Sequence, residues 1–204
     1  NYTYAERQTR FELGLKDRVL ILEDEDWDGK ADKRTVFTED VQMLTSVEVG
    51  KGGVWLMCPP QLLFIPDRDG DDVPDGSPEV VLDGFTVAES NYHNFANGLR
   101  WGPDGWLYGV NGSTTTGKVK CPATGRLIEW QGQMVWRYHP GTTRFEIYAE
   151  GGGNTFSLEI DSKGRVFSGT NNGNTRGMHY PQGSYGKKNW GKHGPLTNPY
   201  AFGY

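Results

Sequence analysis

One β-hairpin pattern recurs three times along the chain, and it restricts the fold more than any other feature. The copies occupy residues 47–56, 99–108 and 158–167. In each copy, two apolar-rich stretches flank a short turn that ends in glycine, which supplies the left-handed backbone conformation of a tight hairpin at little steric cost. The copies begin 52 and 59 residues apart. This spacing predicts a protein assembled from repeated small sheets.

A second kind of hairpin alternates with the first. It pairs residues 19–23 with 35–38, 62–65 with 79–82, and 134–138 with 144–148. Two hairpins make a four-stranded antiparallel unit, and such a unit repeating at roughly 40 to 60 residues is typical of a β-propeller blade. No stretch of the sequence shows a sustained helical periodicity.

We therefore predict an all-β fold, a β-propeller of four-stranded antiparallel blades that is present as a partial ring. Glycine contributes 29 of the 204 residues, about twice its usual share, which suits a turn-rich fold. The expected units of this partial propeller, which spans 1–204, are a half-blade at 17–41, blades at 44–85 and 97–149, and a half-blade with a long loop at 154–204. They amount to about three blades, too few to close a ring.

Composition and charge exclude several classes of protein. No stretch approaches the roughly 18 apolar residues that span a bilayer, so no membrane span is expected in this piece. The net charge is −5 and the acids gather in two short clusters, so nucleic acid is not an expected partner.

Cys58 and Cys121 form no metal or redox motif, which leaves one disulfide or two buried thiols. Because the start has neither an initiating methionine nor a signal peptide, we interpret the chain as a processed or internal fragment.

The two acidic clusters have the spacing of calcium loops. The first acidic loop, residues 24–32, carries Asp at positions 1, 3, 5 and 9 and Gly at position 6, which resembles the first part of an EF-hand loop. The second acidic loop, residues 67–75, repeats the pattern 43 residues later with Asp72 at position 6. The predicted calcium ligands are Asp24, Asp26, Asp28 and Asp32 in the first loop and Asp67, Asp69, Asp71 and Asp75 in the second.

The physical reason for this prediction is the convergence of carboxylates. Side chains at alternate positions of a curled loop meet at one point, and a cation that accepts 6 to 8 oxygens offsets their mutual repulsion. In blades of up-and-down strands, both loops are turns on the face opposite the connection that leads into each innermost strand. Bound calcium is therefore expected to have a structural role. The alternative is a solvated acidic turn without metal.

A histidine stands just before the second copy of the repeated hairpin. His93 belongs to the connection 88–98, which leads into the innermost strand of a blade, so we expect it near the mouth of the axial channel. With an ordinary pKa of about 6.5, its imidazole suits a general base near neutral pH. The alternative is a structural histidine.

Together, His93 and the hairpin 99–108 resemble the glucose/sorbosone dehydrogenase family of six-bladed propellers. Quinone-dependent members of that family carry a catalytic histidine just ahead of such a hairpin. Residues 54–64 and 190–203 are similar, more specifically, to a branch found in planctomycetes and their relatives, whose members are often called membrane-bound dehydrogenases. The resemblance extends over about residues 17–204.

The resemblance implies an oxidoreductase that uses pyrroloquinoline quinone (PQQ). His93 would remove the proton from the anomeric hydroxyl of a sugar or related alcohol while hydride passes to the quinone. Asn94 and Asn198 would contact the cofactor. Arg176 lies in the segment 171–180, which is expected to share a face with His93, and is a proposed cofactor or substrate contact. The resemblance also implies a c-type haem electron acceptor elsewhere in a longer chain or complex, and a periplasmic or extracellular location in a bacterium.

The alternative function is a non-catalytic, calcium-binding propeller that serves as a binding or assembly scaffold. Two positions favour it. Tyr92 precedes His93 where quinone-dependent members often have an acid, and Thr197 precedes Asn198 where they tend to have an arginine. An acid there would orient or charge the imidazole, and an arginine would bind a cofactor carboxylate.

Overall fold

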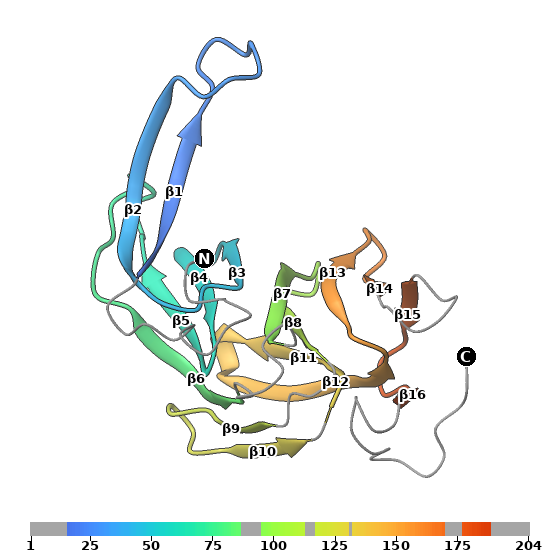
Figure 1. Cartoon of the computed structure of the whole chain (residues 1–204). Coiled ribbons are helices and arrows are strands. Elements are labelled where there is room, and N and C mark those ends of the chain that lie inside the picture. Colours follow the sequence, from blue (N-terminus) through green and yellow to red (C-terminus); the bar gives the residue numbers. More distant parts are fainter. Residues whose placement is uncertain (1–15, 87–94, 113–116, 131, 170–176, 189–204) are drawn as a thin grey trace, which may run out of the picture.

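The computed structural model describes residues 16–86, 95–112, 117–130, 132–169 and 177–188 of the chain (Figure 1). These residues form β-strands, turns and one 3-10 helix of three residues, Pro140–Thr142. The predicted all-β class is therefore confirmed. Within these ranges, no helix is long and apolar enough to cross a membrane.

Four antiparallel groups of strands follow one another in chain order (Figure 1). The first is a two-stranded hairpin, β1 (Asp17–Glu23) and β2 (Lys33–Val41). The second is a meander of β3 (Ser46–Val49), β4 (Gly53–Cys58), β5 (Gln61–Pro66) and β6 (Glu79–Phe85). All the predicted pairings in these two groups are confirmed.

The third meander consists of β7 (Ala96–Trp101), β8 (Leu107–Asn111), β11 (Met134–His139) and β12 (Arg144–Gly152). The fourth group contains β13 (Phe156–Ile160), β14 (Val166–Gly169) and β15 (Gly177–Tyr180). The repeated hairpin of the sequence is β3–β4 in the second group, β7–β8 in the third and β13–β14 in the fourth.

Two sheets contain more than the four strands that the repeat predicts. β9 (Gly117–Lys120) and β10 (Leu127–Trp130) lie between β8 and β11 in the sequence, yet β9 pairs with β6 and extends the second sheet to six strands. β16 (Tyr185–Lys188) pairs in parallel with β12 and makes the third sheet five-stranded. The prediction of four strands was wrong here because an outer edge has unpaired backbone groups that a distant segment satisfies.

The main core lies between the second and third sheets. β4 is buried along its whole length, so it shows a continuous apolar run instead of an alternating one. Trp55 from this strand meets Tyr138 of the third sheet, with ring centroids 6.0 Å apart. Phe85 packs against Trp136 at 5.2 Å, and both are fully buried. Each such aromatic side chain contributes about 2 to 3 kcal/mol through burial.

Both cysteines are free thiols in buried positions, as the second of the two alternatives predicted. Burial raises the pKa of Cys58 to about 12, and the nearby Asp17 carboxylate adds to the shift. The thiol is therefore neutral at physiological pH and behaves as a small apolar group.

Trp136 sets a steric requirement on the neighbouring strand. Gly109 on β8 is its cross-strand partner, and a Cβ at that glycine would overlap the buried indole ring. Overpacking of this kind costs about 1 to 3 kcal/mol, because the ring cannot move within a filled core. We expect Gly109→Ala to lower the free energy of unfolding by about 2 kcal/mol or more in urea titrations.

Gly177→Ala provides the control for that substitution. Gly177 is also a strand residue, but the nearest atom to its added Cβ is the Ser168 carbonyl oxygen at 3.5 Å, an ordinary contact. Its effect should stay within about 0.5 kcal/mol. Equal effects of the two substitutions would contradict the packing assigned to Trp136.

Candidate metal centres

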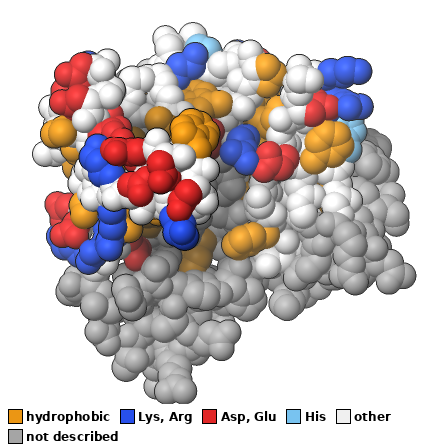
Figure 2. Space-filling model, turned by 90° about the horizontal axis from the view of Figure 1, so that it is seen from above, with side chains coloured by type: hydrophobic (Ala, Val, Ile, Leu, Met, Phe, Trp, Pro, Cys, Tyr) orange, Lys and Arg blue, Asp and Glu red, His pale blue; other side chains and the backbone are white. Residues whose placement is uncertain are grey.

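The two acidic loops form the tips of neighbouring hairpins. The first joins β1 to β2, and the second lies between β5 and β6. Figure 2 shows acidic and basic side chains gathered over the tip of the β1–β2 hairpin, which points toward the viewer. Lys33, where the first loop meets β2, has a raised pKa mainly because it bonds to Glu23, and Asp72 of the second loop adds to the shift.

The same hydrogen bonds close both loops. The residue at position 9 donates its backbone N–H to the carbonyl before position 1, Asp32 to Glu23 and Asp75 to Pro66, each at 2.8 Å. Its carboxylate in turn accepts the N–H of position 2, from Glu25 at 2.9 Å in the first loop and from Arg68 at 2.7 Å in the second. The two loops thus have the same backbone hydrogen bonds although their sequences differ. We call this shared backbone arrangement the loop plan.

Backbone dihedrals repeat in the same way. Position 4 has positive φ in both loops, 63° at Trp27 and 71° at Gly70. Position 6 also has positive φ, 87° at Gly29 and 67° at Asp72. Each loop has glycine at only one of these two left-handed positions. In the first loop it is position 6, and in the second loop it is position 4. The conformation therefore belongs to the loop plan and not to a particular glycine.

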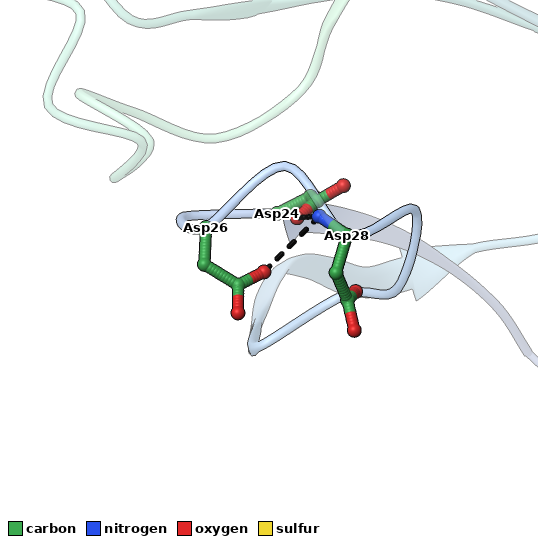
Figure 3. Close-up of side chains that lie close together, drawn as sticks. All are labelled: Asp24, Asp26 and Asp28. Carbon is green, nitrogen blue, oxygen red and sulfur yellow. Dashed lines mark hydrogen bonds between the residues drawn. The ribbon is translucent and has the colours of Figure 1, made fainter.

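Three carboxylates gather in each loop. One oxygen from each of Asp24, Asp26 and Asp28 lies within 4.8 Å of the other two, and Asp67, Asp69 and Asp71 form the equivalent group. Figure 3 shows the first group on one curled stretch of chain, with the carboxylates of Asp26 and Asp28 extending to the same side. Calcium binds oxygen at 2.3–2.6 Å, so ligands on opposite sides of the ion stand roughly 5 Å apart. Oxygens that all lie within 4.8 Å of one another satisfy that limit.

The fourth predicted ligand of each loop lies outside these groups. Asp32 and Asp75 use a carboxylate oxygen to close the loop, as described above. The remaining carboxylates also accept backbone N–H groups, including Lys30 to Asp28 at 2.8 Å and Val73 to Asp71 at 2.9 Å. These bonds hold the three converging side chains in place. Three of the four predicted ligands of each loop therefore lie close together, while the fourth closes the loop, and metal binding itself stays a prediction.

One lysine side chain balances part of the charge of the first loop. The first loop has five carboxylates, and Lys30 forms an ion pair with Asp28 at 2.9 Å. The side chain of Lys30 is 82% exposed, so this pair contributes less than about 1 kcal/mol. So weak a pair would not prevent a cation from reaching the Asp28 carboxylate.

The residues predicted for catalysis and cofactor binding, His93, Asn94, Arg176 and Asn198, lie outside the described residues. The strand ends near His93 are nevertheless described. Ala96 of β7 pairs with Asn111 of β8, which pairs with Met134 of β11. Asn111 is fully buried, and neither polar atom of its side chain has a hydrogen-bond partner among the residues described.

Gln133, immediately before β11, is in the same condition. Leaving such groups unpaired costs about 1 to 3 kcal/mol each. Sequence reasoning missed both residues. The available signal was a single polar residue at the end of each apolar strand.

The fold and loops define an all-β protein with paired acidic hairpin tips. The chain belongs to a family described as a domain of unknown function (DUF7133), whose model matches residues 1–197. No curated protein matches it. Among solved structures, a luciferin-regenerating enzyme is similar over 68% of this chain and 58% of its own chain, with 11% identity and a TM-score of 0.36. This chain thus spans less than two thirds of the length of that enzyme.

The exchanged glycines allow a direct test of the shared loop plan. Asp72→Gly removes a left-handed non-glycine residue and should raise the free energy of unfolding by about 0.5 to 1 kcal/mol in the presence of chelator. Gly29→Ala, at the same position of the first loop, should lower it by about 1 kcal/mol. No atom lies within 4 Å of an added Cβ at Gly29, so φ alone causes the loss. Urea titrations measure both values, and shifts of equal sign would contradict the plan.

Proposed function

We propose that the chain is a calcium-binding module of a β-propeller in which each acidic loop holds one Ca²⁺ for a structural purpose. The observation that carries this proposal is the agreement between two loops of different sequence. Both have the same closing bonds and the same two positive-φ positions, and both bring three carboxylate oxygens within 4.8 Å of one another. Chance acidic turns have no reason to share all three features.

The donor chemistry favours calcium over other common ions. All converging side-chain atoms are carboxylate oxygens, whereas zinc prefers histidine nitrogen and cysteine sulfur. Two of the three ligands in each loop are exposed, which leaves room for water in the coordination sphere. A partly exposed site with three side-chain ligands suits the weak range of extracellular modules, with Kd of about 10⁻⁴ to 10⁻³ M. This range agrees with the proposed periplasmic or extracellular location.

Calcium at these tips would stabilise the least supported strands. β1 and β2 form a sheet of only two strands, and such a hairpin is marginally stable without further support. Its inner face packs on the second sheet through residues such as Val19 and Phe37. A bound cation would offset the mutual repulsion of the carboxylates at each tip.

The propeller itself is part of the proposal. Its support is the order of the sheets, in which β3, β7 and β13 stand at equivalent places of the repeat and β7 contacts both of the others. We propose that the described strands represent about half of a six-bladed ring that serves as a binding or assembly scaffold.

Sugar or alcohol oxidation is a second candidate function, and one observation favours it. The unpartnered side chains of Asn111 and Gln133 lie at the strand ends where His93 is expected, so a polar ligand at this end would satisfy them. PQQ would supply the hydride acceptor there. The roles proposed for this chain are proton removal by His93 and cofactor binding by Arg176, Asn94 and Asn198.

The calcium proposal predicts a stabilisation that depends on particular aspartates. At a calcium concentration 100 times Kd, each occupied site adds about 2.7 kcal/mol to the free energy of unfolding. Asp26→Asn and Asp69→Asn should each remove about half of the total gain, and the double substitution should remove nearly all of it. Thermal and urea unfolding with and without calcium measures these gains.

Glu39→Gln is the matched control, since Glu39 is an exposed acid on β2 outside both loops, paired with Arg18. It should leave the calcium gain unchanged. A wild-type protein whose stability does not respond to calcium would refute the sites. So would an equal loss of the gain in Glu39→Gln, which would indicate general charge screening.

The second candidate predicts dye reduction when the full-length protein is incubated with calcium, PQQ and a panel of sugars. His93→Ala should lower kcat at least 100-fold, the lower end of a general base's contribution. Absence of activity in the wild type, or full activity in His93→Ala, would favour the scaffold.

A further inference from the structure

The strands β3, β7 and β13 carry equivalent residues at each step of the repeat. Ser46 on β3 corresponds to Gly98 on β7 and Ser157 on β13. Two residues further along each strand, Glu48 corresponds to Arg100 and Glu159. β7 and β13 also share an irregularity at this point, where Gly98 and Ser157 have φ of 66° and 63°. The three strands therefore present equivalent surfaces that differ in the side chains at these positions.

The step from β3 to β7 uses side chains of β3 to satisfy the free backbone edge of β7. Ser46 Oγ accepts the N–H of Leu99 at 2.9 Å, and Glu48 Oε1 accepts the N–H of Trp101 at 3.4 Å. The guanidinium of Arg100 lies 3.8 Å from the Glu48 carboxylate. Serine and glutamate on one strand thus bind the next strand, which carries a basic residue.

The step from β7 to β13 also joins a side chain of the earlier strand to the backbone of the later one, but it uses a different position of the repeat. Asn97 Oδ1 accepts the N–H of Ser157 at 2.9 Å, and Arg100 pairs with Glu159 at 2.5 Å. The backbones approach closely, since a Cβ at Gly98 would lie 3.0 Å from the carbonyl carbon of Ser157. Along the three strands the charges alternate as glutamate, arginine, glutamate.

No described strand covers the next surface in this series, on β13 and β14. Phe156 is the residue of β13 that corresponds to Thr45 and Asn97 in the repeat. The side chains of Thr45 and Asn97 form hydrogen bonds to the following strand, whereas Phe156 is 58% exposed. A shallow groove of about 150 Å³ lies there, lined by Ser157, Leu158, Glu159, Phe167, Ser168 and Gly169. Ser157 and Glu159 repeat the serine and glutamate with which β3 binds β7.

We propose that this groove binds a further β-strand whose residue at the place of Arg100 is basic. The inference rests on the proposed propeller arrangement and adds the chemistry of the strand that continues it. A second copy of this chain is disfavoured as the partner if it presents β3, because Glu48 of that strand would repel Glu159. A strand of the β7 kind brings a cation and an unpaired backbone edge.

A fluorescent peptide with the sequence of residues 96–111 tests the proposal, because this β7–β8 hairpin already binds the equivalent surface of β3. Its binding to the whole chain is followed by fluorescence anisotropy at low salt in chelator. We expect saturable binding at least fivefold tighter than that of the same peptide with Arg100→Glu. In the chain, Phe156→Asp should abolish binding, and Glu159→Gln should bring the two peptides within twofold of each other.

Glu159→Gln is a mild change, because the exposed ion pair of Glu159 with Arg100 contributes little to folding. Circular dichroism verifies that both chain variants keep the fold. Absence of binding up to millimolar peptide, or equal binding of the two peptides to the wild type, would overturn the proposal. Self-association in sedimentation that Phe156→Asp abolishes would overturn it in favour of a second copy. The calcium sites do not enter this assay, so its failure is distinct from theirs.

Discussion

The free inner edge of each sheet is the constraint on which the rest of the arrangement depends. β7 is paired with β8 on one side only, and its other edge exposes backbone groups to the interior. An unpaired buried backbone group costs as much as a lost hydrogen bond, so the edge needs partners. Thr45, just before β3, donates its hydroxyl to the Ala96 carbonyl at 2.6 Å. Ser46, the first residue of β3, accepts the N–H of Leu99 on its Oγ at 2.9 Å. Short polar side chains thus fix how closely one sheet follows another.

This spacing determines the packing farther out. Once β3 and β7 are joined, their sheets enclose a space that large aromatic side chains fill, including Trp55, Phe85 and Trp136. Beyond that core the sheets diverge, and the β1–β2 hairpin extends away from the other strands (Figure 1). Apolar contacts decrease toward its tip, where Trp27 is 90% exposed. Metal ligation at the tips would therefore supply stability where packing cannot.

Local signals predicted most of the strands and both loops. Turn glycines and apolar stretches are adjacent in sequence, so the hairpins β3–β4, β7–β8 and β13–β14 could be identified from short segments. The loop spacing likewise located the three aspartates that converge in each loop. The role of Asp32 and Asp75 in closing the loops could not be foreseen, because spacing alone does not show which carboxylate accepts a backbone N–H group. The pairing of β9 with β6 was also hidden, since it joins Phe85 to Gly117 across the strands β7 and β8. Nothing in either segment specifies a partner that far along the chain.

Terbium luminescence tests the central claim, that the acidic loops are cation sites, most directly. Tb³⁺ replaces calcium at oxygen sites, and its emission is sensitised by an indole close to the ion. Trp27 lies between Asp26 and Asp28 within the first loop, so the proposed site contains its own sensitiser. We expect saturable emission that calcium displaces. Trp27→Phe should strongly reduce this emission, and Asp26→Asn should also reduce it although the indole is kept. Emission that survives Asp26→Asn unchanged, or no saturable emission in the wild type, would contradict this claim.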